Sequence, residues 1–214
     1  VIREGQDAPP ELTVRVCDSI TCEMYGANDL VAKLEGIVGD DVRVQRVPCV
    51  GRCEQAPVAV VGMNPIPQAT EKKVMQEVNA NNSHAELPAC IDFTNYQEDD
   101  GYATLKKIVA GDIDNEAVIK TLEDSTLRGL GGAGFPAGRK WRIVRDQEAP
   151  RIMAVNIDEG EPGTFKDRYY LERDPHRFFE GMLIAAHVVG TASIYIYLRD
   201  EYAGIRESME LELA

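Results

Sequence analysis

The chain has 214 residues, enough for one large or two small domains, and no apolar segment is long enough to span a bilayer. Its formal charge of −13 argues against nucleic acid as a partner, because phosphate binding needs a basic face. The N-terminal stretch lacks the basic and apolar regions of a signal peptide, so we expect a cytoplasmic protein. In that compartment, the odd number of five cysteines indicates metal or redox chemistry rather than a disulfide framework.

The N-terminal part of the chain alternates short strands with helices. Residues 12–16 alternate apolar and polar side chains, as a half-buried strand does, and the loop CDSITC follows. The other expected elements are a helix from Ala27 to about Gly36, a strand over 42–47, a strand over 57–61, a turn over 62–65 and a helix over 70–78 capped by Thr70. This β-α-β-β-α order predicts a small open sheet with cysteines in the loops after its first two strands.

The middle of the chain is polar and loop-rich, and we expect it to be a linker over residues 80–101, between domains at 1–79 and 102–214. The second domain is expected to contain helices over 102–110, 115–123, 139–145, 176–189 and 202–213, and strands over 151–157 and 193–198. Strands that alternate with helices predict an α/β domain with parallel strand pairing. Because the chain stops within a helix, we expect this domain to be incomplete at its C-terminus.

Four of the five cysteines form two pairs, each directly after an expected strand. Cys17 and Cys22 are spaced C-x4-C, and Cys49 and Cys53 are spaced C-x3-C. Neighbouring strands would bring the two loops together, and four thiolates suit an iron–sulfur cluster or zinc. Structural zinc more often uses tighter C-x2-C spacings, whereas the wider loops leave room for a 2Fe–2S cluster. The alternative of four core cysteines is disfavoured because buried thiols are not expected to pair at loop starts; Cys90 has no expected role.

Residues 128–141, RGLGGAGFPAGRKW, form a dense glycine loop. Glycine permits backbone conformations that turn successive amides toward one anion, and Lys140 would add a positive charge. The loop therefore predicts a phosphate site. Gly129, Gly131 and Gly134 also satisfy G-x-G-x-x-G, but a classical dinucleotide fold needs a strand before the first glycine, and the preceding segment is helical.

A second polar segment, NIDEGEPGTFKD at residues 156–167, carries groups able to bond hydroxyls and ring nitrogens. It follows the strand over 151–157, and α/β sheets bind ligands beyond the carboxyl ends of their strands. We therefore expect a nucleotide-type cofactor between this acidic loop and the glycine loop; a solvated turn or a weak divalent-metal site are the alternatives. The mixed charges over 167–174 predict a surface with local ion pairs, and His176 and His187 predict core or capping positions.

The cysteine loops also carry a family resemblance. CDSITC followed by PCVGRCEQAPV resembles the thioredoxin-like 2Fe–2S ferredoxin domain found beside the flavin subunit of NADH-oxidising complexes. The resemblance runs from about Leu12 to Val78 and matches all four ligand positions. It implies that the cluster is bound by Cys17, Cys22, Cys49 and Cys53.

The glycine loop and AVNIDEGEPGTFKDR at 154–168 resemble the family of FMN and NADH-binding subunits found in respiratory complex I, bidirectional hydrogenases and soluble NAD-dependent formate dehydrogenases. The resemblance implies a Rossmann-like but non-classical α/β FMN-binding domain after the thioredoxin-like domain. It implies these site residues: Gly129, Gly131, Gly132 and Lys140 along the FMN phosphate and ribityl chain, Asn156, Asp158 and Glu159 on the flavin, Phe135 on the NADH adenine and Glu161 beside the nicotinamide nucleotide.

The implied function is electron transfer, in which FMN exchanges a hydride with NAD(H) and iron–sulfur clusters carry single electrons, with no side chain acting as a catalytic acid or base. Both domains on one chain resemble the beta subunit of soluble NAD-dependent formate dehydrogenase. The implied partner is then a molybdenum- or tungsten-containing iron–sulfur alpha subunit, with a 4Fe–4S cluster only in a longer chain.

Two alternatives share this chemistry: the diaphorase subunit of an NAD-reducing hydrogenase, with hydrogenase subunits as partners, and a subunit of NADH-quinone oxidoreductase. An alternative of another class is a non-catalytic metal-binding docking module.

Overall fold

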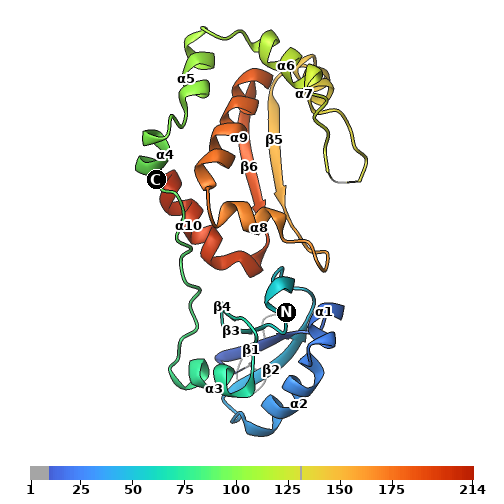
Figure 1. The fold of residues 1–214 in the computed structure, drawn as a ribbon, viewed down its shortest axis with the longest axis vertical. Coiled ribbons are helices and arrows are strands. Elements are labelled where there is room, and N and C mark those ends of the chain that lie inside the picture. Colours follow the sequence, from blue (N-terminus) through green and yellow to red (C-terminus); the bar gives the residue numbers. More distant parts are fainter. Residues whose placement is uncertain (1–9, 131) are drawn as a thin grey trace. The chain divides into compact units, whose positions relative to one another are not determined.

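The computed structural model describes residues 10–130 and 132–214, and the chain divides into two compact units (Figure 1). The first unit comprises the chain up to Pro88 together with Asp158–Tyr169 and Arg199–Leu211. The second unit comprises Ala89–Ile157, Tyr170–Leu198 and the last three residues. The chain therefore enters the first unit three times, and each unit is described separately below.

The first unit is built on a four-stranded sheet with the order β2-β1-β3-β4. Its strands are β1 (Leu12–Cys17), β2 (Val42–Val47), β3 (Ala59–Val61) and β4 (Asn64–Ile66). β1 pairs with β2 in parallel, whereas β1 with β3 and β3 with β4 are antiparallel. Because β1 and β2 are parallel neighbours, the loops that follow them begin at the same edge of the sheet.

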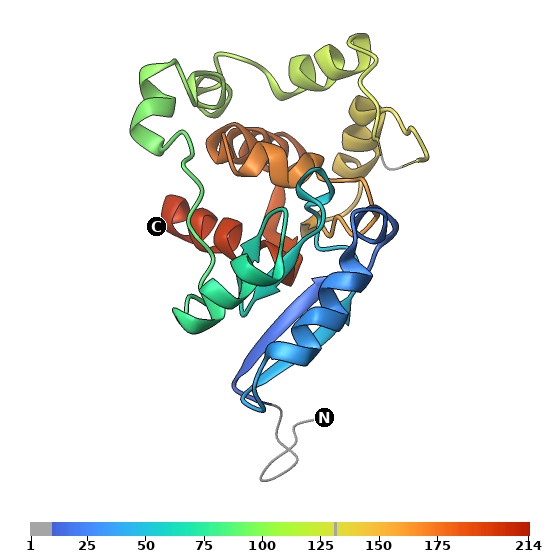
Figure 2. The ribbon, with the colours of Figure 1, turned by 60° about the horizontal axis from the view of Figure 1, so that its bottom comes forward.

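Helices α2 (Ala27–Ile37) and α3 (Glu71–Asn79) pack against this sheet and against each other (Figure 2). Alternate residues of β1, Val14 and Val16, are fully buried in a core with Leu34 and Val74, as the alternating pattern predicts. Thr70 caps α3 through its hydroxyl, which accepts from the backbone N–H of Lys73 at 3.3 Å. The expected β-α-β-β-α order is confirmed.

Two elements of the first unit differ from the sequence expectation. The turn predicted over 62–65 is confirmed only at residues 62–63, because β4 begins at Asn64 and pairs with β3 as a hairpin. The predicted cysteine loop contains a short helix, α1 (Ile20–Met24). Both elements are too short to repeat a hydrophobic pattern clearly, so the sequence carries too little signal to predict them.

The second unit contains a parallel pair of strands, β5 (Arg151–Ile157) and β6 (Thr191–Leu198), joined through α9 (Pro175–Val189), which packs against β6 (Figure 1). This is the expected α/β arrangement with parallel pairing. The other helices are α4 (Phe93–Glu98), α5 (Ala103–Ala110), α6 (Asn115–Asp124) and α7 (Ala137–Arg145), while α8 (Lys166–Leu171) and α10 (Ala203–Leu213) each cross a boundary between units. No helix in the described ranges is long and apolar enough to cross a membrane.

Helix α4 lies in the segment predicted to be a loop-rich linker. Asp92 caps it by accepting the N–H of Asn95 at 2.9 Å, and Tyr96 is buried. His176 on α9 stacks near the Tyr96 ring with centroids 5.7 Å apart and is hydrogen-bonded to the Tyr102 hydroxyl at 2.8 Å. His176 is thus a core residue, as predicted, and its aromatic contacts explain why the polar sequence nevertheless folds into a helix here.

Candidate functional site

The four cysteines expected to bind a cluster all lie in the first unit, around the edge where β1 and β2 end. Cys17 is the last residue of β1 and Cys22 lies in α1, and both are buried. Cys49 and Cys53 lie on the loop after β2, and their Sγ atoms are 3.4 Å apart. The structure therefore brings the cysteines together as two close pairs.

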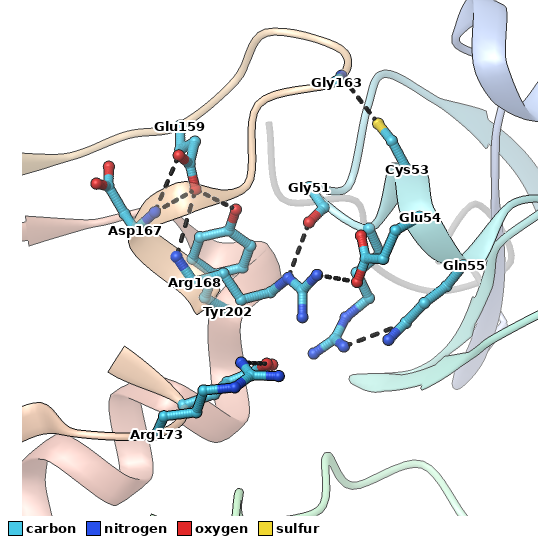
Figure 3. A network of polar contacts seen from close by, with 12 residues as sticks. Gly51, Cys53, Glu54, Gln55, Glu159, Gly163, Asp167, Arg168, Arg173 and Tyr202 are labelled. Carbon is cyan, nitrogen blue, oxygen red and sulfur yellow. Dashed lines mark hydrogen bonds and ion pairs between the residues drawn. The ribbon is translucent and has the colours of Figure 1, made fainter. Parts of the chain in front are cut away.

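The thiols have donors around them. The backbone N–H of Gly51 donates to Cys49 Sγ at 3.4 Å, and that of Gly163 donates to Cys53 Sγ at 3.1 Å (Figure 3). A hydrogen bond from Cys22 holds the pKa of the Cys17 thiol at about 6, well below its ordinary value. The same pairing raises the pKa of Cys22, and burial raises that of Cys49 to about 11. Metal binding would remove these protons, because thiolates are the ligand form.

The arrangement in two pairs fits a two-iron centre. Each iron of a 2Fe–2S cluster takes two thiolates, and Cys49 with Cys53 and Cys17 with Cys22 form two such pairs. The donor set and the amides beside it therefore fit a 2Fe–2S cluster.

The glycine loop is in the second unit and is closed at its base. Gly129 N–H donates to the carbonyl of Phe135 at 3.0 Å, and the Arg128 guanidinium donates to the carbonyl of Gly134 at 2.9 Å. Gly132 has φ +90° and Gly134 has φ +58°, and a methyl group added at either would meet no atom within 4 Å. The loop thus has the left-handed backbone and open space that an anion cradle requires. The expected ligand Gly131 lies outside the described residues.

Helix α7 begins directly after this loop and carries Lys140. A pocket of about 400 Å³ opens between α7, α9 and β5. Lys140 and Trp141 line it from α7, and Asn156 lines it at the end of β5. The structure therefore brings together two of the residues expected to bind FMN, and an apolar pocket with few polar groups is typical of a cofactor site. Phe135 is half exposed beneath the guanidinium of Arg139, at 5.8 Å from ring centroid to Cζ.

The acidic loop after β5 belongs to the first unit, where Asp158 and Glu161 are exposed. Glu159 is only 2% exposed, and its carboxylate accepts from the N–H of Asp167 at 3.0 Å and from the Tyr202 hydroxyl at 3.1 Å (Figure 3). Burial alone would raise the pKa of Glu159, but these hydrogen bonds and the Lys166 ammonium outweigh it and lower the pKa. Glu159 thus fixes the first turn of α8 by accepting hydrogen bonds from its backbone N–H groups.

Three residues of the site were missed or misjudged from the sequence. Arg168 was expected in a surface charge run, but it is 3% exposed and donates from Nε to the carbonyl of Gly51 at 2.9 Å (Figure 3). Arg199 is also buried and donates from Nη2 to the carbonyl of Cys49 at 2.6 Å. Tyr202 is fully buried beside them. Only Arg168 could have been identified from the sequence, because it is the last residue of the acidic motif at 154–168. Arg199 and Tyr202 belong to the site only through contacts with residues distant in sequence.

Comparison with family models gives two matches that together cover most of the chain. Residues 6–82 match the family described as thioredoxin-like [2Fe-2S] ferredoxin. Residues 122–214 match the family described as Nuo51 FMN-binding domain. The chain joins a thioredoxin-like [2Fe-2S] ferredoxin domain to a Nuo51-type FMN-binding domain. The predicted fold class is confirmed, and so are FMN and a 2Fe–2S cluster as the cofactors of these domain types.

Curated relatives match about half of the chain. A subunit of the NADH-quinone oxidoreductase of Aquifex aeolicus is 44% identical over 118 residues, which cover 55% of this chain and 27% of that protein. The alpha subunit of the NAD-reducing hydrogenase HoxS of Cupriavidus necator is 50% identical over 99 residues, covering 46% of this chain and 16% of that protein. The matches thus span about a quarter or less of these relatives' length.

A solved structure matches both domains. A chain in the crystal structure of an NAD+-reducing [NiFe]-hydrogenase in the air-oxidised state superposes with a TM-score of 0.80 and 28% identity. The superposition covers 97% of this chain and 41% of that chain. The likeness thus extends over nearly the whole of this chain but over less than half of the hydrogenase chain.

Proposed function

We propose that this chain is part of a diaphorase-type electron-transfer subunit that passes electrons between NAD(H), FMN and a 2Fe–2S cluster. The observation that carries the proposal is the pairing, on one chain, of two cysteine pairs fit for a two-iron cluster with a glycine loop and pocket fit for FMN. The names of the relatives, which are oxidoreductases of NADH or NAD, support NAD(H) as the nucleotide.

In this proposal, the residues of the chain bind and orient, and they do not act as acids or bases. Bound FMN would supply hydride exchange with the nicotinamide, and the cluster would supply one-electron transfer. Lys140 and the glycine loop would hold the phosphate end of the flavin, and the amide of Asn156 would bond its polar edge. Phe135 would stack on adenine, and Asp158, Glu159 and Glu161 would line the flavin and nucleotide from the acidic loop.

The apolar wall of the pocket would keep water from the reacting atoms. We further propose domains at 1–79 and 102–214 with a linker at 80–101, and a cytoplasmic location.

The enzyme complex to which this subunit belongs is a finer proposal with three candidates. The resemblance described from the sequence favours a formate dehydrogenase, whose molybdenum- or tungsten-containing alpha subunit would deliver electrons from formate. The second candidate is an NAD-reducing hydrogenase, favoured by the HoxS relative and by the hydrogenase chain that covers 97% of this one. The third candidate is an NADH-quinone oxidoreductase, favoured by the Aquifex aeolicus relative. The comparisons support the hydrogenase and the NADH-quinone oxidoreductase more directly than the formate dehydrogenase.

The test begins with iron, sulfide, zinc and flavin analysis of the native protein purified with its partners. Equal iron and sulfide, an S = 1/2 EPR signal after dithionite reduction, bound FMN and NADH-dependent dye reduction are the expected results. Zinc without sulfide or flavin would contradict the proposal and favour the docking module. Reduction of NAD+ by formate or by hydrogen in the same preparation then selects the partner.

A further inference from the structure

Two buried arginines are bound to the backbone of the cluster-binding loop. Arg199 donates from Nη2 to the carbonyl of Cys49, a predicted ligand, at 2.6 Å. Arg168 donates from Nε to the carbonyl of Gly51 at 2.9 Å (Figure 3). Arg168 comes after β5 in the sequence and Arg199 comes directly after β6, and both strands belong to the second unit. Both arginines nevertheless belong to the first unit, with the cysteines. We call them the arginine clamp.

Each arginine has a carboxylate partner that is more accessible to water than the arginine itself. The Arg168 side chain is 4% exposed and pairs with Glu54, whose side chain is 35% exposed. The Arg199 side chain is 6% exposed and pairs with Glu201 at 2.9 Å, whose side chain is 32% exposed. Solvent screens the carboxylates more than the guanidinium groups, so the positive charge acts more strongly on the loop than its counter-charge.

Other charges near the clamp are of both signs. The buried carboxylate of Glu159 lies close by through Tyr202, but it is compensated by the Lys166 ammonium at 3.3 Å and by backbone donors. The guanidinium groups contact the ligand loop directly, whereas the Glu159 carboxylate reaches it only through other residues. The clamp therefore places two buried positive charges in direct contact with the backbone of this loop.

We propose that the arginine clamp raises the reduction potential of the 2Fe–2S cluster. One-electron reduction makes the cluster more negative, and fixed positive charge or N–H donors near the sulfurs stabilise that reduced form. The acidic loop adds to the effect because Gly163 donates its N–H to Cys53 Sγ at 3.1 Å. Arg168 and Arg199 are thus positioning residues, acting through the ligand loop. This inference rests on the cluster assigned in the proposed function.

The test is a redox titration of the cluster, followed by EPR, in the full protein with its partners. The signal of this cluster is first assigned as the one that Cys49→Ala removes. Arg199→Gln is expected to shift the equilibrium about tenfold toward the oxidised cluster, or about 59 mV to lower potential for one electron. Glu201→Gln removes the counter-charge and is expected to shift the potential upward.

Two further variants separate charge from structure. Arg199→Lys keeps the charge and is expected to retain most of the wild-type potential. Arg206→Gln removes an equally charged but exposed side chain of the same unit, 56% exposed, and is expected to shift the potential far less. If Arg199→Gln assembles no cluster, the upward shift of Glu201→Gln carries the test.

An unchanged potential in both Arg199→Gln and Glu201→Gln, with an intact EPR signal, would show that the arginines are only structural and would overturn the inference. A wild-type protein without the EPR signal would instead overturn the cluster assignment, and the inference with it.

Discussion

Gly51 lies in the loop that we propose binds the cluster, where it packs closely against Tyr202. Its φ of +70° is a conformation that other residues adopt only with strain, and a methyl group there would lie 2.3 Å from the Tyr202 hydroxyl. The Gly51 N–H is also one of the donors to Cys49. A single missing side chain thus permits both the turn of the loop and its contact with the buried tyrosine.

We expect Gly51→Ala to destabilise the protein by about 2–5 kcal/mol, from backbone strain plus overpacking, and to reduce cluster content. Gly26→Ala is the matched control, since Gly26 has φ +90° but nothing within 4 Å of the added methyl group. The control should lose only about 1–2 kcal/mol and keep its cluster. Denaturant unfolding and iron analysis measure both; equal losses in the two variants would contradict the role of Tyr202.

Glu159 gives the stability of the first unit a pH dependence. Its folded-state pKa is lowered, so its ionised form stabilises the fold above the unfolded-state pKa, about 4.3, and this contribution is lost as pH falls through the folded-state pKa. Glu159→Gln should lower the unfolding free energy at pH 7 by about 1.5–3 kcal/mol. The deficit should shrink in acid.

Unfolding curves from pH 7 down to about pH 3, across the acid window set by carboxyl pKa values, would measure this effect. Glu35→Gln on the exposed face of α2 is the control and should change little at any pH. If the difference in unfolding free energy between Glu159→Gln and the wild type stayed constant across this range, ionisation of Glu159 would not be the source of its stabilising effect.

Lys140 lines the pocket that we propose for FMN. Because an ion pair with phosphate contributes about 1.5–3 kcal/mol, Lys140→Ala should weaken FMN binding by roughly tenfold or more. Quenching of flavin fluorescence, titrated into flavin-depleted protein, measures the affinity. Lys120→Ala, on the exposed side of α6 in an ion pair with Asp124, should leave the affinity unchanged. Equal affinities of Lys140→Ala and the wild type would exclude the lysine from the phosphate site.

At the scale of elements, the position of α7 depends on its close approach to α6. A methyl group on Gly138 would lie 2.7 Å from the backbone nitrogen of Glu123 and 3.0 Å from the carbonyl of Ile119. Arg142 adds a bidentate contact to Glu123 at 2.9 and 3.0 Å. Since α7 carries Lys140 and Trp141, the packing of these two helices contributes to the shape of the pocket that we propose for FMN.

We expect Gly138→Ala to cost about 1–3 kcal/mol and to weaken FMN binding even though the residue is not placed on the flavin. Gly181→Ala in α9 is the control, because its added methyl group meets nothing within 4 Å, and it should stabilise the helix by about 0.5–1 kcal/mol. Thermal unfolding with and without FMN separates the two effects. A Gly138→Ala protein as stable as the control would show that α7 can shift freely.

Elements with a clear period could be predicted from the sequence, and those that depend on distant contacts could not. β1, with alternating Val14 and Val16, and α3, with its Thr70 cap, carry their signals locally. Helix α4 does not, because its aromatic residues find partners on α9, far along the chain.

The candidate site follows the same division. The cysteine pairs and Lys140 are visible as motifs, but Arg199 reaches Cys49 across 150 residues of sequence. No local pattern encodes such a contact, and a charged residue in sequence suggests a surface by default.

At the scale of the whole molecule, the first unit is assembled from three separate stretches of chain. The buried apolar cluster packed on its sheet comes from residues between Val14 and Val74, whereas the arginine clamp and Tyr202 come from the two later stretches. Fold stability and protection of the cluster loop therefore have different sources in the sequence.

We expect a fragment of residues 1–88 to fold with most of the stability of the first unit but to lose its cluster faster than the full chain. Decay of the visible absorption in the presence of an iron chelator measures the loss. The full chain carrying Arg43→Gln, a substitution on β2 outside the clamp, is the control for a lost positive charge. Equal decay rates in the fragment and the full chain would contradict this division of roles.

The separation of 150 residues between Cys49 and Arg199 also sets the time between their synthesis on the ribosome. A ribosome adds about 5–20 residues per second, so roughly 8–30 seconds pass between synthesis of the ligand loop and synthesis of its clamp. Late in that interval the core residues up to Val74 have been synthesised, whereas Arg199 has not. The order of the sequence thus leaves an opening in which a cluster can be delivered before the later stretches close over it.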